Sequence, residues 1–176
     1  GDHNVVLGSQ GVPSVLRNNG DGTFVEIQSF ASASGLMDFA WADLDADGDP
    51  DAGLIHTAGK LHVFSNERQG QFSERSVPDN ISSPLAINLL DFNNDGVLDL
   101  LIAQDNGAIV GLSDKDHGAG WDVVQLAAPT AGDKLLSFGV ADVENSGGRD
   151  VVLAESTRAL VLLNEGKEKF TSNRTP

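Results

Sequence analysis

Apolar residues occur in short runs, and polar segments that contain glycine separate these runs along the chain. The most apolar runs precede three acidic stretches and comprise residues 36–42, 85–90 and 135–141. A second set follows the acidic stretches directly, at residues 52–55, 100–103 and 151–154. A third set precedes a polar turn, at residues 60–64, 107–112 and 158–163. A fourth set follows such a turn, at residues 24–27, 72–75 and 121–126. Because such short runs are typical of strands and no segment shows helical periodicity, the pattern predicts an all-β chain.

The order of these segments repeats, and two independent markers have nearly the same spacing. The last aspartates of the acidic stretches are 48 and 51 positions apart, at Asp51, Asp99 and Asp150. The aromatic residues that follow the polar turns are 48, 49 and 49 positions apart, at Phe24, Phe72, Trp121 and Phe170. This agreement indicates a true repeat, with units of approximately 1–34, 35–83, 84–133 and 134–176.

Four strands in a unit of this length are typical of the blades of a β-propeller. We therefore expect blades of four antiparallel strands, about three and a half of them, which make a partial propeller. The first unit has no innermost strand before its acidic segment, and a closed ring usually needs about four to eight blades. We expect another protein or chain segment to complete the propeller.

Composition narrows the possible partners. The 176 residues suffice for one sizeable core, and 11 basic against 26 acidic residues give a net charge of −15, which argues against a nucleic-acid partner. Membrane insertion is not expected, because every apolar run is much shorter than the roughly 20 residues of a membrane span. The chain has no cysteine, so disulfides, thiolate catalysis and zinc–sulfur sites are excluded.

The acidic stretches are candidate calcium loops, because alternating oxygen ligands in a short loop suit this ion. In the first loop the ligands at positions 1, 3, 5, 7 and 9 would be Asp43, Asp45, Asp47, Asp49 and Asp51. In the second loop they would be Asp91, Asn93, Asp95, Val97 and Asp99. In the third loop they would be Asp142, Glu144, Ser146, Gly148 and Asp150. Position 7 would contribute its backbone carbonyl, which explains why valine is acceptable there, and position 6 is glycine throughout.

The loops differ from two other types of metal site. An EF-hand requires glutamate at position 12, where this chain has Leu54, Ile102 and Leu153, and magnesium would prefer more water and fewer carboxylates. The third loop carries fewer charges, so we expect it to bind calcium weakly or not at all. Asp2 is interpreted as a ligand from an earlier copy of the loop. The alternative is that these loops are acidic turns that merely separate strands.

The pattern D-x-D-x-D-G-x-x-D after an apolar strand, with N-N-G-D-G-T-F at residues 18–24, resembles the FG-GAP or VCBS-type repeat of integrin α-subunit propellers and of many secreted bacterial proteins. The resemblance extends over nearly the whole chain. Phe138 and Gly139 resemble the motif's name-giving pair, but no Gly-Ala-Pro follows, so the match is closer to the VCBS branch. The resemblance implies a β-propeller with calcium between the first two strands of each blade. It also implies an extracellular, cell-surface or periplasmic location.

The predicted function is a non-catalytic, calcium-binding module for extracellular protein interaction or adhesion, in which calcium is structural. The alternatives are a carbohydrate-binding, lectin-like propeller and the propeller domain of a polysaccharide-degrading enzyme, which would need a base such as His56 or Glu155. The four histidines show no metal-binding spacing, and both tryptophans are expected to pack in the core. A glycan is a possible partner, but the residues that would bind a ligand are not evident from the sequence.

Overall fold

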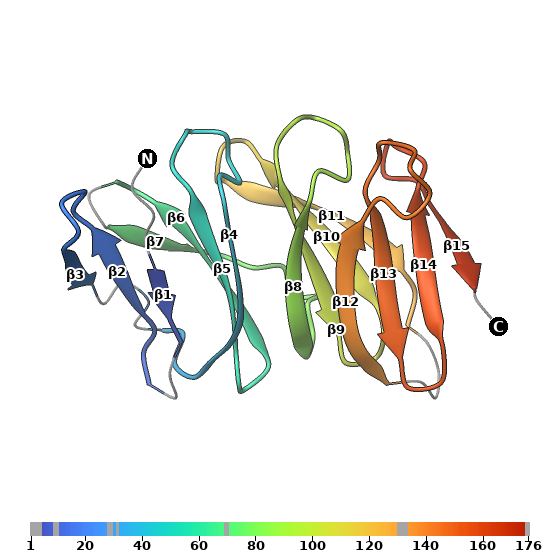
Figure 1. Ribbon diagram of the computed structural model, residues 1–176, viewed down its shortest axis with the longest axis horizontal. Helices are drawn as coiled ribbons and strands as arrows, with labels where there is room; N and C mark the ends of the chain where they lie inside the picture. Colours follow the sequence, from blue (N-terminus) through green and yellow to red (C-terminus); the bar gives the residue numbers. More distant parts are fainter. Residues whose placement is uncertain are drawn as a thin grey trace.

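The computed structural model describes residues 5–8, 11–27, 30, 32–68, 71–129 and 134–174, and this part of the chain contains strands but no helix. The strands form four sheets that stand side by side in a row, with the two chain termini at opposite ends (Figure 1). Over the described residues the sheets do not close into a ring. The described residues contain no helical segment with the length and hydrophobicity that a membrane span requires.

Each sheet is a simple meander of consecutive antiparallel strands. The first contains β1 (Val5–Leu7), β2 (Ser14–Asn18) and β3 (Phe24–Ile27). The second contains β4 (Leu36–Ala42), β5 (Asp51–His56), β6 (Lys60–Asn66) and β7 (Phe72–Arg75). The third contains β8 (Pro84–Leu90), β9 (Asp99–Gln104), β10 (Ile109–Lys115) and β11 (Gly120–Ala127). The fourth contains β12 (Leu135–Ala141), β13 (Asp150–Glu155), β14 (Ala159–Asn164) and β15 (Phe170–Arg174). Each four-stranded sheet is called a blade below, and the prediction of all-β propeller blades is confirmed.

The blades also share an irregularity at the start of their first strand. The register shifts between Leu36 and Asp38 where β4 pairs with β5, and equivalent shifts occur between Pro84 and Ala86 and between Leu135 and Ser137. A β-bulge bends and twists a strand locally. The three blades therefore share an irregularity of pairing at the same place. The third strand of the third blade begins at Ile109, two residues later than the apolar run predicts.

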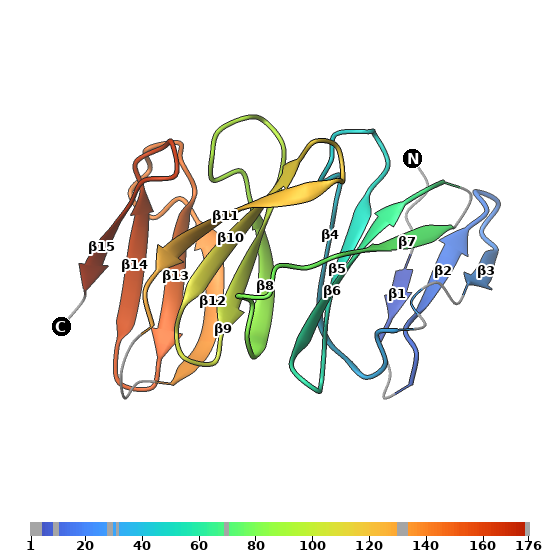
Figure 2. The same cartoon turned by 180° about the vertical axis from the view of Figure 1, so that it is seen from behind.

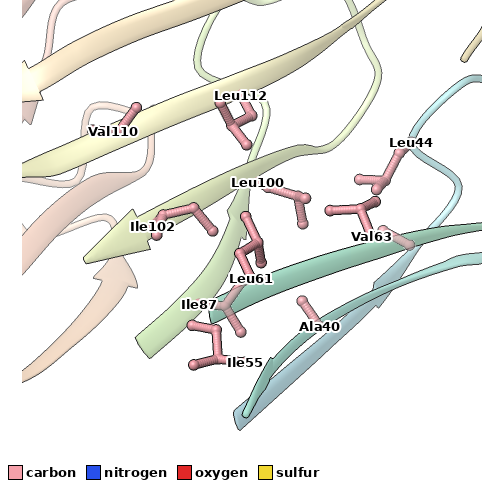
Figure 3. Close-up of a cluster of buried hydrophobic side chains, with 11 residues drawn as sticks. Ala40, Leu44, Ile55, Leu61, Val63, Ile87, Leu100, Ile102, Val110 and Leu112 are labelled. Carbon is pink, nitrogen blue, oxygen red and sulfur yellow. The ribbon is translucent and has the colours of Figure 1, made fainter. Parts of the chain in front are cut away.

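The hydrophobic core lies between neighbouring sheets. One cluster joins the second and third sheets and contains residues from both, including Ile55, Val63, Leu100 and Ile102 (Figure 3). Similar clusters join the first to the second sheet and the third to the fourth. The second strands β5 and β9 are buried almost throughout. This burial explains why residues 52–55 and 100–103, between the polar ends of these strands, are apolar without alternation.

The acidic loops join the first and second strands of the blades, and all three lie at the same end of the molecule, the upper end in Figure 1. A buried aromatic residue ties the second of these loops to the core. Phe92 follows the first aspartate of that loop and is fully buried, and a Cβ atom at Gly111 would lie only 2.6 Å from its ring. Gly111 in β10 therefore makes the space that Phe92 occupies.

Candidate metal centre

The first aspartate of each acidic loop organises the turn through its two carboxylate oxygens. Asp43 Oδ1 accepts the backbone N–H of Asp47 at 3.1 Å, and its Oδ2 accepts that of Gly48 at 3.0 Å. Asp91 accepts the equivalent N–H groups of Asp95 and Gly96 at 3.1 and 3.0 Å, and Asp142 those of Ser146 and Gly147 at 3.0 and 2.9 Å. The third loop therefore has the same turn as the other two, although two of its candidate ligands differ.

Two residues of each loop have a left-handed backbone. Position 4 has φ values of 60°, 62° and 58° at Ala46, Asn94 and Asn145, and position 6 has φ values of 92°, 91° and 91° at Gly48, Gly96 and Gly147. Glycine and asparagine tolerate this conformation, whereas an alanine adopts it at a cost. No atom lies within 4 Å of a Cβ placed on any of these three glycines. Backbone conformation, not space, is thus the reason for glycine at position 6.

The side chains at position 5 extend the turn. Asp47 Oδ1 accepts the N–H of Asp49 at 2.9 Å, Asp95 Oδ1 that of Val97 at 2.8 Å, and Ser146 Oγ that of Gly148 at 3.3 Å. In such turns a side chain bonds the backbone two residues later, so the loop is shaped by contacts within it. The alternation of residues at positions 1, 3 and 5 therefore has a local structural cause.

The last aspartate of each loop is buried and anchors the loop to the sheet. Asp51, Asp99 and Asp150 are 1%, 1% and 0% exposed. Each accepts the N–H of the second loop residue at 2.9 to 3.0 Å, and these donors are Leu44, Phe92 and Val143. Asp51 and Asp150 also accept an N–H from the third strand of their blade, at Asn66 and Asn164, both at 2.9 Å.

This burial has an electrostatic consequence. Loss of hydration raises the pKa of Asp51 to about 6, although hydrogen bonds from Asn66 and Leu44 oppose the increase. Burial likewise raises the pKa of Asp99 to about 6, against hydrogen bonds from Ser113 and Phe92. The pKa of Asp45 is also raised, first by burial and then by the neighbouring charge of Asp47. A cation in the loop would offset the cost of these charges, so the environment fits a metal ion.

The first loop brings three carboxylates together. Asp43, Asp45 and Asp51 each place one oxygen so that all three lie within 4.8 Å of one another, and this is the one such group found among the described residues. Hard oxygen ligands at this separation suit calcium. The carboxylate of Asp49 instead binds Arg68 Nε at 2.5 Å. This ion pair is compatible with the predicted role of Asp49, which is to bind the ion through its backbone carbonyl and not through its carboxylate.

The other predicted ligands differ in their surroundings. In the second loop, Asn93 Nδ2 donates to Asp95 Oδ2 at 2.9 Å and to Ser113 Oγ at 3.0 Å, while Asn93 Oδ1 accepts the N–H of Asp95 at 3.0 Å. In the third loop, Asp142 and Glu144 are exposed. Asp2, the predicted ligand from an earlier copy of the loop, lies outside the described residues.

Sequence analysis missed a group of residues beside the first loop. A cavity of about 500 Å³ lies there, and its lining includes Asp45, Asp47, Arg75, His117, Gly120 and Trp121. Only 5% of the Arg75 side chain is exposed, and its Nη2 donates to Asp114 Oδ1 at 2.5 Å and to the Gly120 carbonyl at 3.0 Å. The guanidinium carbon lies 3.8 Å from the centroid of the Trp121 ring. These contacts join residues of different blades, so their spacing in the sequence carries no signal.

The two residues named as possible bases have other partners. Glu155 is buried, and its carboxylate accepts a hydrogen bond from Arg158 Nε at 2.5 Å. His56 Nδ1 accepts the N–H of Ala58 at 3.0 Å. The sequence spacing did not indicate that the His56 and His62 rings are neighbours, yet their centroids are 5.0 Å apart. His62 Nδ1 lies 2.5 Å from Glu74 Oε1.

Comparisons with known proteins agree with this architecture. Residues 1–54 match the family described as FG-GAP-like repeat. No curated protein matches the sequence. Among solved structures, the chain is similar to a lectin of Agrocybe aegerita described as specifically recognising non-reducing terminal N-acetylglucosamine. The TM-score is 0.63 and the identity 18%; the similarity covers 97% of this chain and 48% of the lectin chain.

The chain thus spans about half the length of that lectin, and at this identity the similarity concerns the fold alone. The sequence match at its N-terminal end and the arrangement of its sheets lead to the same conclusion. The described part of the chain has the sheets of an open, partial β-propeller, and its residues 1–54 match the FG-GAP-like repeat.

Proposed function

We propose that this protein is a calcium-stabilised propeller module that serves extracellular protein interaction or adhesion without chemistry of its own. Calcium would be held in the first loop by the side chains of Asp43, Asp45, Asp47 and Asp51 and by the Asp49 carbonyl. In the second loop it would be held by Asp91, Asn93, Asp95 and Asp99 and by the Val97 carbonyl. The observation that carries the proposal is the cluster of Asp43, Asp45 and Asp51, whose oxygens converge within 4.8 Å although one of the carboxylates is buried.

The role of the ion would be electrostatic. Like charges in one short loop repel, and burial of Asp51 and Asp99 adds the cost of lost hydration. A bound divalent cation offsets both effects and orders the turn between the two innermost strands of a blade. The third loop keeps the turn but has Glu144 and Ser146 at positions 3 and 5, so weaker binding is proposed there.

An extracellular, cell-surface or periplasmic setting suits such sites. Extracellular calcium-binding modules work at dissociation constants of about 10⁻⁴ to 10⁻³ M, because free calcium outside the cell is high. Adhesion and other protein interactions are consistent with a rigid scaffold whose ligand specificity lies in loops.

Calorimetric titration of chelator-treated protein with calcium tests the proposal. We expect at least two sites, and Asp95→Ala should remove the site of the second loop and leave that of the first. Asp79→Ala is the matched control, because Asp79 is an exposed aspartate outside the loops. Absence of any binding at millimolar calcium would refute the calcium function.

Carbohydrate binding is a second candidate function, favoured by the cavity beside the first loop. Asp45 and Asp47 provide acceptors, and Trp121 provides an aromatic surface in the cavity wall. Polar groups beside an aromatic surface are typical of ligand pockets, and the similar lectin is described as recognising non-reducing terminal N-acetylglucosamine. A glycan array probed with and without calcium tests this candidate. Binding that Trp121→Ala abolishes would support it, and an array without a positive glycan would oppose it.

A further inference from the structure

A hairpin of the third blade contacts the first acidic loop, which belongs to the second blade. The turn between β10 and β11 lies beside the loop between β4 and β5 (Figure 2). His117 Nδ1 lies 3.1 Å from the backbone carbonyl oxygen of Asp45. A Cβ atom at Gly118 would lie 3.6 Å from Asp45 Oδ2, so the hairpin backbone closely approaches a candidate ligand of the metal.

An ion pair holds this hairpin on the second blade. Arg75, the last residue of β7, binds Asp114 Oδ1 at 2.5 Å, and both side chains are largely buried. The same carboxylate accepts the N–H of Gly118 at 2.9 Å, inside the turn. Trp121 stacks on Arg75, and its Nε1 donates to the Ser76 carbonyl at 2.9 Å. The hairpin is therefore attached to the second blade on both of its strands, and its tip is positioned over the loop.

The next pair of blades shows the same approach without the ion pair. The N–H of Glu168, in the hairpin between β14 and β15, donates to the Phe92 carbonyl at 3.2 Å. A Cβ atom at Gly166 would lie 3.1 Å from Asn94 Nδ2. In both cases the hairpin of one blade contacts positions 2 to 4 of the preceding acidic loop. Arg75 stands three residues after Phe72, and the equivalent residue of the next blade, three residues after Trp121, is Val124. Valine cannot form an ion pair, so of these two loops only the first has a neighbouring hairpin held in this way.

We propose that two blades together form the first cation site. The hairpin of residues 114–120 positions the loop of residues 43–51 for the ion, and the ion pair of Arg75 with Asp114 holds this hairpin in place. Calcium binding and the packing of the third blade on the second then stabilise each other, since coupling between two equilibria is reciprocal. The inference rests on the proposed calcium function. It adds Arg75 and His117 as positioning residues that do not themselves bind the ion.

Arg75 allows electrostatics to be separated from positioning. Removal of a cation near a calcium site should tighten binding if charge alone matters. If the ion pair positions the loop, Arg75→Gln should weaken binding. His117→Ala removes the contact with the Asp45 carbonyl from an exposed position. Lys115→Gln is the matched control, because it also removes a positive charge from this hairpin. The partner of Lys115 is Asp122, which lies outside the acidic loop.

The experiment is calcium titration by calorimetry in the Asp95→Ala background, which leaves the first loop as the strongest remaining site. We expect Arg75→Gln and His117→Ala to lower the affinity of this loop by about 5- to 150-fold, the usual range of coupling between sites, and Lys115→Gln to leave it unchanged or tighter. Hydrogen exchange in the peptide of residues 114–120 should slow when calcium is added to the parent protein, but not to Arg75→Gln.

The outcomes separate the two proposals. Unchanged or tighter calcium binding by His117→Ala and by folded Arg75→Gln would overturn the two-blade site and leave the calcium function intact. Failure of the parent protein to bind calcium would overturn the calcium function itself. If Arg75→Gln does not fold, His117→Ala decides, because its side chain lies at the surface and is not part of the core.

Discussion

Asp43 and Gly48 define the acidic turn, because Oδ2 of the aspartate accepts the glycine N–H at 3.0 Å while the glycine has a φ of 92°. The pairs Asp91–Gly96 and Asp142–Gly147 reproduce this relationship at 3.0 and 2.9 Å. The turn is thus formed by groups five residues apart. Calcium would act on the charges that the turn brings together.

Calcium should raise the stability of the protein, and a chelator should lower it. Binding to the folded state alone adds RT ln(1 + [L]/Kd), about 2.7 kcal/mol for each site at a hundredfold excess over Kd. Two sites would contribute roughly 5 kcal/mol, comparable with the whole stability of a small domain. Thermal melts in chelator, calcium and magnesium check this. We expect the highest melting temperature in calcium and little recovery in magnesium, whereas three superimposable curves would contradict a metal role.

The third loop should become a calcium site when its ligands are restored. Glu144→Asp with Ser146→Asp gives this loop the ligand pattern of the first, and Asp142, Gly147 and Asp150 already form the same turn. Calorimetry should then show one additional or clearly tighter site, because ligand charge sets calcium affinity. The reverse pair, Asp45→Glu with Asp47→Ser, is the control and should weaken the first loop. An unchanged number and strength of sites in both variants would show that charge at positions 3 and 5 is irrelevant.

Ala46 should be a point of backbone strain. It has a φ of 60° at a position where the other two loops have asparagine. A left-handed conformation costs an alanine about 1–2 kcal/mol, and asparagine tolerates it better. We expect Ala46→Asn to increase the free energy of unfolding by about 1 kcal/mol and Asn94→Ala to decrease it by a similar amount. Denaturant titration in chelator measures both, and equal stability of all three proteins would argue against strain.

The stability of calcium-free protein should depend on pH through Asp51 and Asp99. Burial raises the pKa of both groups to about 6, above the usual value of 3.8. The folded state therefore binds more protons than the unfolded state between about pH 4 and 6, and the stabilisation from this uptake is lost as the pH rises through 6. Protons and calcium compete for the same carboxylates, so calcium affinity should fall as the pH decreases below 6.

Unfolding measured from pH 4 to 8 in chelator checks this dependence, with Asp51→Asn as the comparison. Asparagine does not titrate, so this variant should lose the part of the pH dependence that belongs to Asp51. If the variant and the parent protein show the same change of stability across pH 6, Asp51 is not the titrating group.

Much of the fold was predictable because its determinants are local. The order of apolar runs and turns repeats along the chain, and each four-stranded sheet is a meander of consecutive strands. The acidic turn is likewise encoded within about one loop, since an aspartate at position 1 and a glycine at position 6 satisfy each other. The sequence alone therefore determined the type of fold, the position of the loops and the residues at their alternating positions.

The tertiary structure decided which of these residues are buried and what lies beside them. Asp51, Asp99 and Asp150 differ from the other loop aspartates through burial, which depends on the strands that cover them and not on their spacing. The contact of His117 with Asp45 spans 72 positions, and that of Arg75 with Asp114 spans 39. Such contacts arise only when two sheets pack face to face, because the packing fixes which hairpin meets which loop. No local pattern of residues specifies that meeting, so it became visible only in the folded chain.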